Sequence, residues 1–234
     1  MTAQQNPGIA NPRTVKSYVI RGNRMTEGQE KAWQLHWPVF GLDETQGRQD
    51  WSQVFGNDHP LVLEIGFGMG SSLVAMAQAS PELNFIGVEV HRPGVGSLMM
   101  RASDAGLANL RVFCCDANIV LAQCLAEASL RRVQLYFPDP WHKTRHQKRR
   151  IVQPEFVQRI RQVLEKDGIF HLATDWEHYA RHMLKVLNAA PGFANLSEQG
   201  TYCPKPDYRP DTKFEHRGLK LGHGVWDLLF RRTE

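Results

Sequence analysis

Short apolar runs alternate with amphipathic segments along most of the chain after residue 60. Five runs rich in β-branched and aromatic residues predict strands at residues 61–65, 85–90, 111–114, 133–137 and 169–173. Four of them are nearly continuous in apolar residues, as strands buried on both faces of a sheet should be. The clearest helical stripe comprises Phe156, Val157, Ile160, Val163 and Leu164. It follows Pro154, a residue favoured at a helix start, and Asp167-Gly168 predicts its end.

This alternation of strands and helices predicts the fold class. It is typical of βαβ units and of an α/β fold with a mostly parallel, doubly wound sheet. Two further runs, at residues 193–199 and 225–231, predict strands that bring the sheet to seven. Such sheets bind ligands at the carboxyl ends of their strands, so chemistry is expected in the loops that follow strands.

The composition divides the chain into three parts. Residues 1–13 are rich in Asn, Gln, Pro and Gly, which predicts disorder. Residues 14–58 carry several aromatic side chains without a clean period, and we expect an N-terminal extension packed on the main domain. Residues 59–234 are expected to form that domain.

Composition and cysteine spacing exclude several classes of protein. Hydrophobic residues make up 42% and charged residues 22% of the chain, which is ordinary for a globular protein. No run approaches the ~20 apolar residues of a membrane span, and the first residues lack the apolar core of a secretory signal. The four cysteines form no C-x-x-C pair. We therefore expect a cytoplasmic protein that binds neither metal nor membrane.

Positive charge is concentrated in one segment. The net charge is only +4, yet residues 131–150 hold seven Lys or Arg against one acid. This local charge of +6 leaves −2 for the rest of the chain. A basic patch on a nearly neutral protein predicts contact with a polyanion.

A glycine turn follows the first predicted strand. Gly66, Gly68 and Gly70 allow a sharp turn and a close approach of the backbone to a ligand. The spacing G-x-G-x-G departs from the dinucleotide fingerprint, since position 71 is serine. The start of the next helix favours a carboxylate group, so no pyrophosphate is needed.

Acids stand at the ends of three successive predicted strands: Glu64, Glu89 and Asp116. Glu89 can accept from ribose hydroxyls, Asp116 from an adenine amino group, and Glu64 from an ammonium group. Singly, each acid could equally cap a helix. Together they favour a cationic adenosyl ligand and would repel a pyrophosphate.

The fourth predicted strand leads into Phe137-Pro138-Asp139-Pro140-Trp141. The prolines restrict the backbone around Asp139 and fix its carboxylate beside a ring that could stack on a base. Lys143 follows, and then an acid-free run comprising Arg145, His146, Gln147, Lys148, Arg149 and Arg150. This run is expected to attract RNA phosphates to the site. A turn aspartate and a solvated helix face are the plainer interpretations.

Two more segments place polar groups near the predicted site. Asp175 follows the fifth predicted strand, between a threonine and a tryptophan. Residues 208–218 are dense in charged groups and precede a predicted strand. A loop of this kind could fold over a substrate base, although an ordinary surface loop would have the same composition.

These segments together resemble the bacterial tRNA (guanine-N7-)-methyltransferase family. The matching stretches are LEIGFGMG, FIGVEVHRPGVG, YFPDPWHKTRHQKRRIV, ATDWEHYARHML and YRPDTKFEHRGLKLGHGVWDLLF. They fall within roughly residues 15–231, and the PDPW run with its basic tail and the TKFE segment are the most specific.

The resemblance implies a Rossmann-like class I methyltransferase fold with its last strand antiparallel. It implies transfer of a methyl group from S-adenosyl-L-methionine to N7 of guanosine 46 in the tRNA variable loop. Its donor-binding acids match Glu64, Glu89, Asp116 and Asp139, and Asp139 also matches the catalytic residue. Its substrate-binding positions match Lys143, Asp175, Thr212, Lys213, Phe214 and Glu215, and its RNA-contacting segment matches residues 145–150.

Alternatives stay open on the sequence alone. They are a methyltransferase for another RNA or another acceptor, a non-catalytic RNA-binding module on this fold, and a nicotinamide oxidoreductase. The basic run argues against a small-molecule or protein acceptor. The acids at the strand ends argue against a non-catalytic module, and the serine at position 71 argues against a nicotinamide dinucleotide cofactor. We expect a monomer with tRNA as its partner, since no extended apolar helix face is left unassigned.

Overall fold

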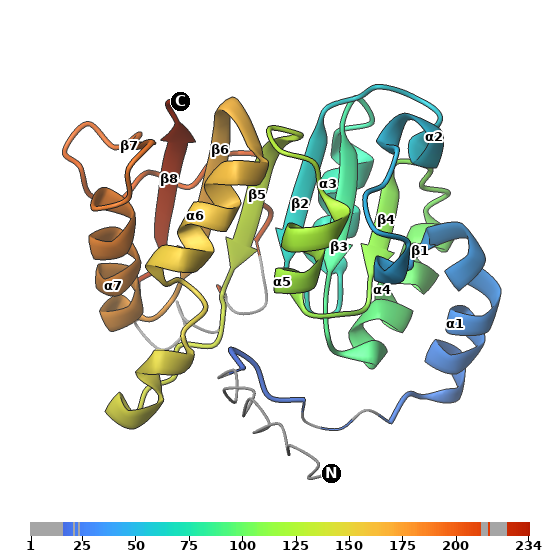
Figure 1. The fold of residues 1–234 in the computed structure, drawn as a ribbon. Helices are drawn as coiled ribbons and strands as arrows, with labels where there is room; N and C mark the ends of the chain where they lie inside the picture. Colours follow the sequence, from blue (N-terminus) through green and yellow to red (C-terminus); the bar gives the residue numbers. More distant parts are fainter. Residues whose placement is uncertain (1–15, 21, 23, 212–214, 216–223) are drawn as a thin grey trace, which may run out of the picture.

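The structure is a computed structural model that describes residues 16–20, 22, 24–211, 215 and 224–234. An eight-stranded sheet with helices on both faces dominates this part of the chain (Figure 1). The strand order is β1-β4-β3-β2-β5-β6-β8-β7. The pairs are parallel except that β8 runs antiparallel to β6 and β7. The predicted doubly wound α/β fold with an antiparallel last strand is confirmed.

The strands correspond to the seven predicted runs and one more. They are β1 (Gly41–Leu42), β2 (Leu61–Ile65), β3 (Asn84–Val88), β4 (Leu110–Phe113), β5 (Leu130–Tyr136), β6 (Leu164–Thr174), β7 (Phe193–Asn195) and β8 (Trp226–Arg232). The extra strand, β1, comes from the N-terminal extension and pairs with β4. A strand of two residues shows no hydrophobic periodicity, so the sequence pattern could not predict β1.

The helices form two layers around the sheet. They are α1 (Glu27–Phe40), α2 (Trp51–Phe55), α3 (Ser71–Ala79), α4 (Arg92–Asp104), α5 (Ala117–Ile119), α6 (Pro154–Val163) and α7 (Glu177–Asn188), with the turns η1 (Glu44–Gln46), η2 (Val120–Cys124) and η3 (Thr144–Arg149). Side chains of α3, α4 and α1 form one core against the sheet, and those of α5, α6 and α7 form the other. Among the described helices, none has the length and hydropathy to cross a membrane.

Helix α6 shows how far local pattern sets the elements. Pro154 occupies its first turn, and Phe156, Val157 and Ile160 are buried as predicted. The predicted end at Asp167-Gly168 is wrong, because the helix ends at Val163 and β6 begins at the next residue. Residue 164 pairs with Leu130 of β5, so sheet pairing overrides the helical period there.

The N-terminal extension packs on the sheet through α1. The Thr26 hydroxyl accepts from the Gln29 N–H while the Gln29 side chain accepts from the Thr26 N–H, which fixes the helix start. Helix α1 then lies against α4, where the Arg92 guanidinium covers the Trp33 ring at 4.6 Å. Residues 1–13 lie outside the described residues, and the division of the chain at residues 58 and 59 stays a prediction.

Candidate active site

The turn after β2 holds three glycines in left-handed backbone conformations. The φ angles of Gly66, Gly68 and Gly70 are 76°, 59° and 79°, which side chains strongly disfavour. A Cβ on Gly66 or Gly68 would meet no atom within 4 Å, whereas a Cβ on Gly70 would lie 2.5 Å from Cβ of Leu98. The turn therefore packs against α4 on one side and faces open space on the other, as a ligand cradle requires.

Replacing Gly70 with alanine is expected to destabilise the protein more than replacing Gly66. Both variants force an alanine into a left-handed conformation, at a cost of roughly 1–2 kcal/mol. Only the alanine at residue 70 also overlaps Leu98, which adds about 1–3 kcal/mol. Urea denaturation measures the two free energies of unfolding, and equal values would contradict the packing role of Gly70.

The Glu89 carboxylate binds three backbone N–H groups at the carboxyl edge of the sheet. Its Oε2 accepts from Gly68 at 3.0 Å, and its Oε1 accepts from Val90 at 2.6 Å and His91 at 3.0 Å. These contacts hold the glycine turn against the start of α4. The structure therefore brings Glu89 and the glycine turn into direct contact, and the role of Glu89 toward a ribose stays a prediction.

Glu64 is a buried carboxyl group with an unsatisfied oxygen. It is 3% exposed, and its Oε2 has no hydrogen-bond partner in the described part of the chain. Burial raises the pKa of Glu64 to about 8, with the charge of Glu89 adding to the shift and that of Arg132 opposing it. Buried polar groups are normally satisfied, so this oxygen fits a ligand that donates to it, such as an ammonium group.

A cavity of about 300 Å³ opens at this edge of the sheet. Of the predicted donor-binding residues, those that line it are Gly66, Glu89, Asp116 and Asp139. Glu64 on β2 and Gly68 and Gly70 in the turn after it are not part of its lining. The donor set and the open cradle fit S-adenosyl-L-methionine, whose amino acid and adenosine parts need acceptors at these strand ends.

Residues 17–20 also line this cavity, which sequence reasoning missed. The Tyr18 hydroxyl bonds to Asp116, and burial together with that carboxylate raises the pKa of Tyr18. The Ser17 carbonyl accepts from Trp141 Nε1 at 3.0 Å, and the Lys16 carbonyl accepts from Arg149 Nε at 3.1 Å. Figure 1 shows the segment running along the carboxyl edge of the sheet. No pattern in the sequence around residues 16–20 predicts these contacts.

Asp139 stands in a strained turn between two cavities. Phe137 and Trp141, which bracket Pro138-Asp139-Pro140, have positive φ angles of 49° and 47°. Residues other than glycine adopt this region at a cost, and such strain is concentrated at functional sites. Asp139 and Val19 line the first cavity and also a neighbouring one of about 630 Å³.

The second cavity has a cationic and aromatic wall. Besides Val19 and Asp139, its lining is Pro140, Trp141, His142, Lys143, His146 and Arg149. The Arg149 guanidinium covers the Trp141 ring at 4.5 Å. Desolvation and the surrounding cations lower the pKa of His146, so this ring adds no charge near neutral pH. The structure thus brings Lys143, His146 and Arg149 to Asp139, as the sequence predicts.

The structure contradicts the predicted RNA contact of Arg150. It is 2% exposed, donates from Nε to the Pro140 carbonyl at 2.9 Å, and contacts His178 Nδ1 at 3.0 Å. Its guanidinium also packs on the Tyr179 ring. The prediction of an RNA contact is wrong for this residue, because its charge supports the Asp139 turn from inside. Arg145 and Lys148 are exposed on η3, and Gln147 is half-buried.

The basic patch is smaller than the charge count of residues 131–150 suggests. Arg131 pairs with Glu165 at 2.8 Å, and Arg132 packs over the Tyr208 ring at 3.9 Å. Both arginines belong to β5, where Arg131 is exposed but paired, whereas Lys143, Arg145 and Lys148 are exposed on and beside η3. Within residues 131–150, the exposed cations other than the paired Arg131 therefore gather at the rim of the second cavity.

The remaining predicted substrate residues come from the segments after β6 and β7. Asp175 follows β6, and the neighbouring Trp176 ring meets His142 edge-on at 4.2 Å, which brings this segment to the Asp139 turn. Glu215 is 7% exposed and pairs with Arg209. Thr212, Lys213 and Phe214 lie outside the described residues.

Comparison with known proteins identifies relatives over the whole chain. Residues 58–228 match a family described as "Putative methyltransferase". The chain is 60% identical over 222 residues to the tRNA (guanine-N(7)-)-methyltransferase of Pseudoalteromonas translucida (strain TAC 125), covering 95% of this chain and 92% of the relative. It is 59% identical over 237 residues to that of Marinobacter nauticus, covering all of both chains.

Solved structures support the fold. The 16S rRNA methyltransferase KamB superposes with a TM-score of 0.60 at 14% identity, over 79% of this chain and 93% of that one. A 16S rRNA (adenine(1408)-N(1))-methyltransferase from Catenulisporales acidiphilia, solved with its cosubstrate SAM, gives 0.53 at 15% identity, over 82% and 92%. With its full-length relatives, this chain belongs to the S-adenosyl-L-methionine-dependent tRNA (guanine-N7-)-methyltransferase family.

Proposed function

We propose that this protein transfers the methyl group of S-adenosyl-L-methionine to N7 of guanosine 46 in the tRNA variable loop. The observation that carries the proposal is that Asp139 lines both cavities. One cavity is edged by acids suited to the donor, and the other by cations and aromatic rings suited to RNA. The names of the full-length relatives support methylation of tRNA guanine at N7.

The donor-side residues bind and orient the donor. S-adenosyl-L-methionine, when bound, supplies an electrophilic methyl group on a sulfonium. In our proposal Glu89 accepts from the ribose hydroxyls, Asp116 from the adenine amino group and Glu64 from the ammonium. Gly66, Gly68 and Gly70 let the backbone approach the ligand.

Asp139 stabilises charge rather than removing a proton. Guanine N7 has a free lone pair and carries no proton in the neutral base, so its attack needs no general base. Positive charge develops on the purine as the new bond forms, and a fixed carboxylate beside it lowers the barrier. The strained turn holds Asp139 in place, which supplies the positioning that such a transfer requires. The reaction requires no metal.

The acceptor side is assigned to the rim of the second cavity. Lys143, Asp175 and residues 212–215 contact the guanosine in this proposal, while Arg145, His146, Gln147, Lys148 and Arg149 contact the RNA backbone. Direct phosphate contacts favour the arginines and lysines among them. The protein acts on tRNA as a monomer in the cytoplasm.

Incubation with methyl-labelled donor and bulk tRNA tests the proposal. Borohydride and aniline treatment cleaves RNA at N7-methylguanosine, so the expected result is a labelled tRNA that breaks at position 46. If the label is found at another nucleotide, that nucleotide is the substrate and position 46 is not. No transfer to any tRNA would refute the activity.

Donor binding is expected to release a proton from Glu64. With its pKa at about 8, this carboxyl is mostly neutral at pH 7, whereas an ammonium partner favours the ionised form. The affinity for S-adenosyl-L-methionine should therefore rise with pH by up to roughly tenfold per unit, and level off above the pKa. Calorimetry in buffers of different ionisation enthalpy measures the released proton. Glu64→Gln should bind more weakly and release none, and a wild-type affinity independent of pH would exclude this role.

A further inference from the structure

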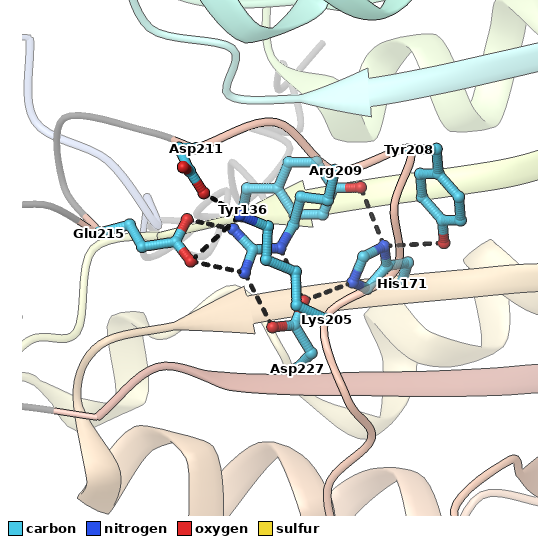
Figure 2. A network of polar contacts seen from close by, with 8 residues as sticks. All are labelled: Tyr136, His171, Lys205, Tyr208, Arg209, Asp211, Glu215 and Asp227. Carbon is cyan, nitrogen blue, oxygen red and sulfur yellow. Dashed lines mark hydrogen bonds and ion pairs between the residues drawn. The ribbon is translucent and has the colours of Figure 1, made fainter.

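A buried polar network joins the loop between β7 and β8 to the sheet. Figure 2 shows Glu215 and Asp227 joined to Arg209 of that loop, with His171 and its two tyrosines beyond Asp227. Arg209 is 1% exposed, and its two carboxylate partners, Asp227 of β8 and Glu215, are 3% and 7% exposed. Burial of this much charge requires that each group be paired, so the network fixes the loop strongly.

Arg209 binds two carboxylates at once. Its Nε and Nη2 donate to Oδ1 and Oδ2 of Asp227 at 2.7 and 2.9 Å. Its Nη1 and Nη2 donate to Oε2 and Oε1 of Glu215 at 2.8 and 3.2 Å. A planar guanidinium makes two such forks, and a lysine ammonium cannot. The arginine thereby sets both the distance and the orientation of Glu215 relative to β8.

The network also reaches the first cavity. His171 Nε2 lies 2.8 Å from Asp227 Oδ1, and its Nδ1 lies 2.9 Å from the hydroxyls of both Tyr136 and Tyr208. Burial lowers the pKa of His171 although Asp227 opposes this, so the neutral ring donates from Nε2 and accepts at Nδ1. Tyr136 lines the first cavity. Continuous contacts therefore run from that cavity to Glu215.

The same network lies behind the Asp139 turn. The Arg209 guanidinium is 5.8 Å from the centre of the Phe137 ring, and Phe137 begins the turn. Lys205 completes the charge around Glu215, with its Nζ 3.5 Å from Oε1, and also pairs with Asp211. Arg209 thus links Glu215 to the segment that carries Asp139, although both residues come from the loop before β8.

We propose that Arg209 is a positioning residue for the methyl transfer. Asp227 fixes Arg209 on β8, and Arg209 in turn places the carboxylate of Glu215 against the acceptor base beside Asp139. This inference rests on the proposed function, in which Glu215 contacts the guanosine. Arg209 acts through Glu215 and touches neither donor nor acceptor.

The test compares R209K, E215Q and the double variant with the wild-type protein. R209K keeps the buried charge but loses the forks, so kcat should fall by at least about tenfold. The KM for tRNA and the donor Kd should stay within about twofold, since η3 and the donor-binding acids are unchanged. The matched control is R231K, which lies on β8 like Asp227 but pairs with Asp167 at 3.8 Å, and it should keep the wild-type kcat.

The double variant separates positioning from structural support. If Arg209 acts through Glu215, the kcat of R209K/E215Q should equal that of E215Q alone, because coupled residues are not additive. Reductions in kcat that multiply would overturn the proposal, as would a wild-type kcat in R209K.

A second variant covers the case in which R209K does not fold. E215D leaves the Arg209–Asp227 pair intact and keeps the charge, but draws the carboxylate back by one methylene. Its kcat should also fall by at least about tenfold, and a wild-type kcat would overturn the proposal. Failure of the wild-type protein to methylate N7 would instead refute the proposed function, so the two failures are distinguishable.

Discussion

Replacement of Asp139 with asparagine is expected to lower kcat by about 100- to 1,000-fold, or about 2.7–4 kcal/mol of transition-state stabilisation. Asparagine keeps the shape of the side chain but removes the negative charge that faces both cavities. The effect should fall on kcat, because the charge on the purine develops only during transfer. Single-turnover transfer of a labelled methyl group to tRNA measures it.

The matched control is Asp104→Asn, which removes an exposed carboxylate at the end of α4. It should retain the wild-type rate, and the melting temperature of both variants should stay close to that of the parent. A full rate in Asp139→Asn would show that the carboxylate charge is dispensable, which would end the electrostatic account of the reaction.

Replacement of Arg145, Lys148 and Arg149 with glutamine is expected to weaken tRNA binding by about 10- to 100-fold at low salt. These cations lie on η3 at the rim of the second cavity. Each phosphate that is no longer neutralised by a cation lowers the slope of log K against log salt concentration by about 0.7–0.9. Filter binding over a range of salt concentrations should therefore give a slope reduced by roughly 2 to 3.

Arg150→Gln is the informative contrast for this triple variant. Arg150 belongs to the same basic run but is buried against Pro140 and His178. Its replacement should lower thermal stability and the transfer rate while leaving the salt slope unchanged. An unchanged slope in the triple variant would place the RNA backbone on another surface.

The central βαβ part of the fold was predictable because its signals are local. The runs of β2, β3 and residues 133–136 of β5 are nearly continuous in apolar residues, and α6 carries a clear stripe behind Pro154. The extension was harder, although Thr26 and Gln29 form a capping box whose spacing is visible in the sequence. Strand β1 gave no signal, since its two residues are held only by pairing with β4.

The residues of the candidate site also fall into those that the sequence could predict and those that it could not. Glu64, Glu89 and Asp116 could be placed together because neighbouring parallel strands end at one edge. The contact of Tyr18 with Asp116 joins residues almost 100 positions apart and leaves no local trace. Arg149 and Arg150 are chemically identical neighbours, and tertiary packing alone sends one to the cavity wall and buries the other.

The left-handed backbone at Phe137 and Trp141 limits how far the PDPW segment can be transplanted. Neither residue prefers that conformation, so the surroundings must impose it. The Phe137 N–H is held by the Ala173 carbonyl, Trp141 by Ser17, and the Pro140 carbonyl by Arg150. A short peptide with this sequence would relax to ordinary angles, and a graft onto another scaffold would lose the arrangement. The most recognisable stretch of the family is therefore one of its least portable parts.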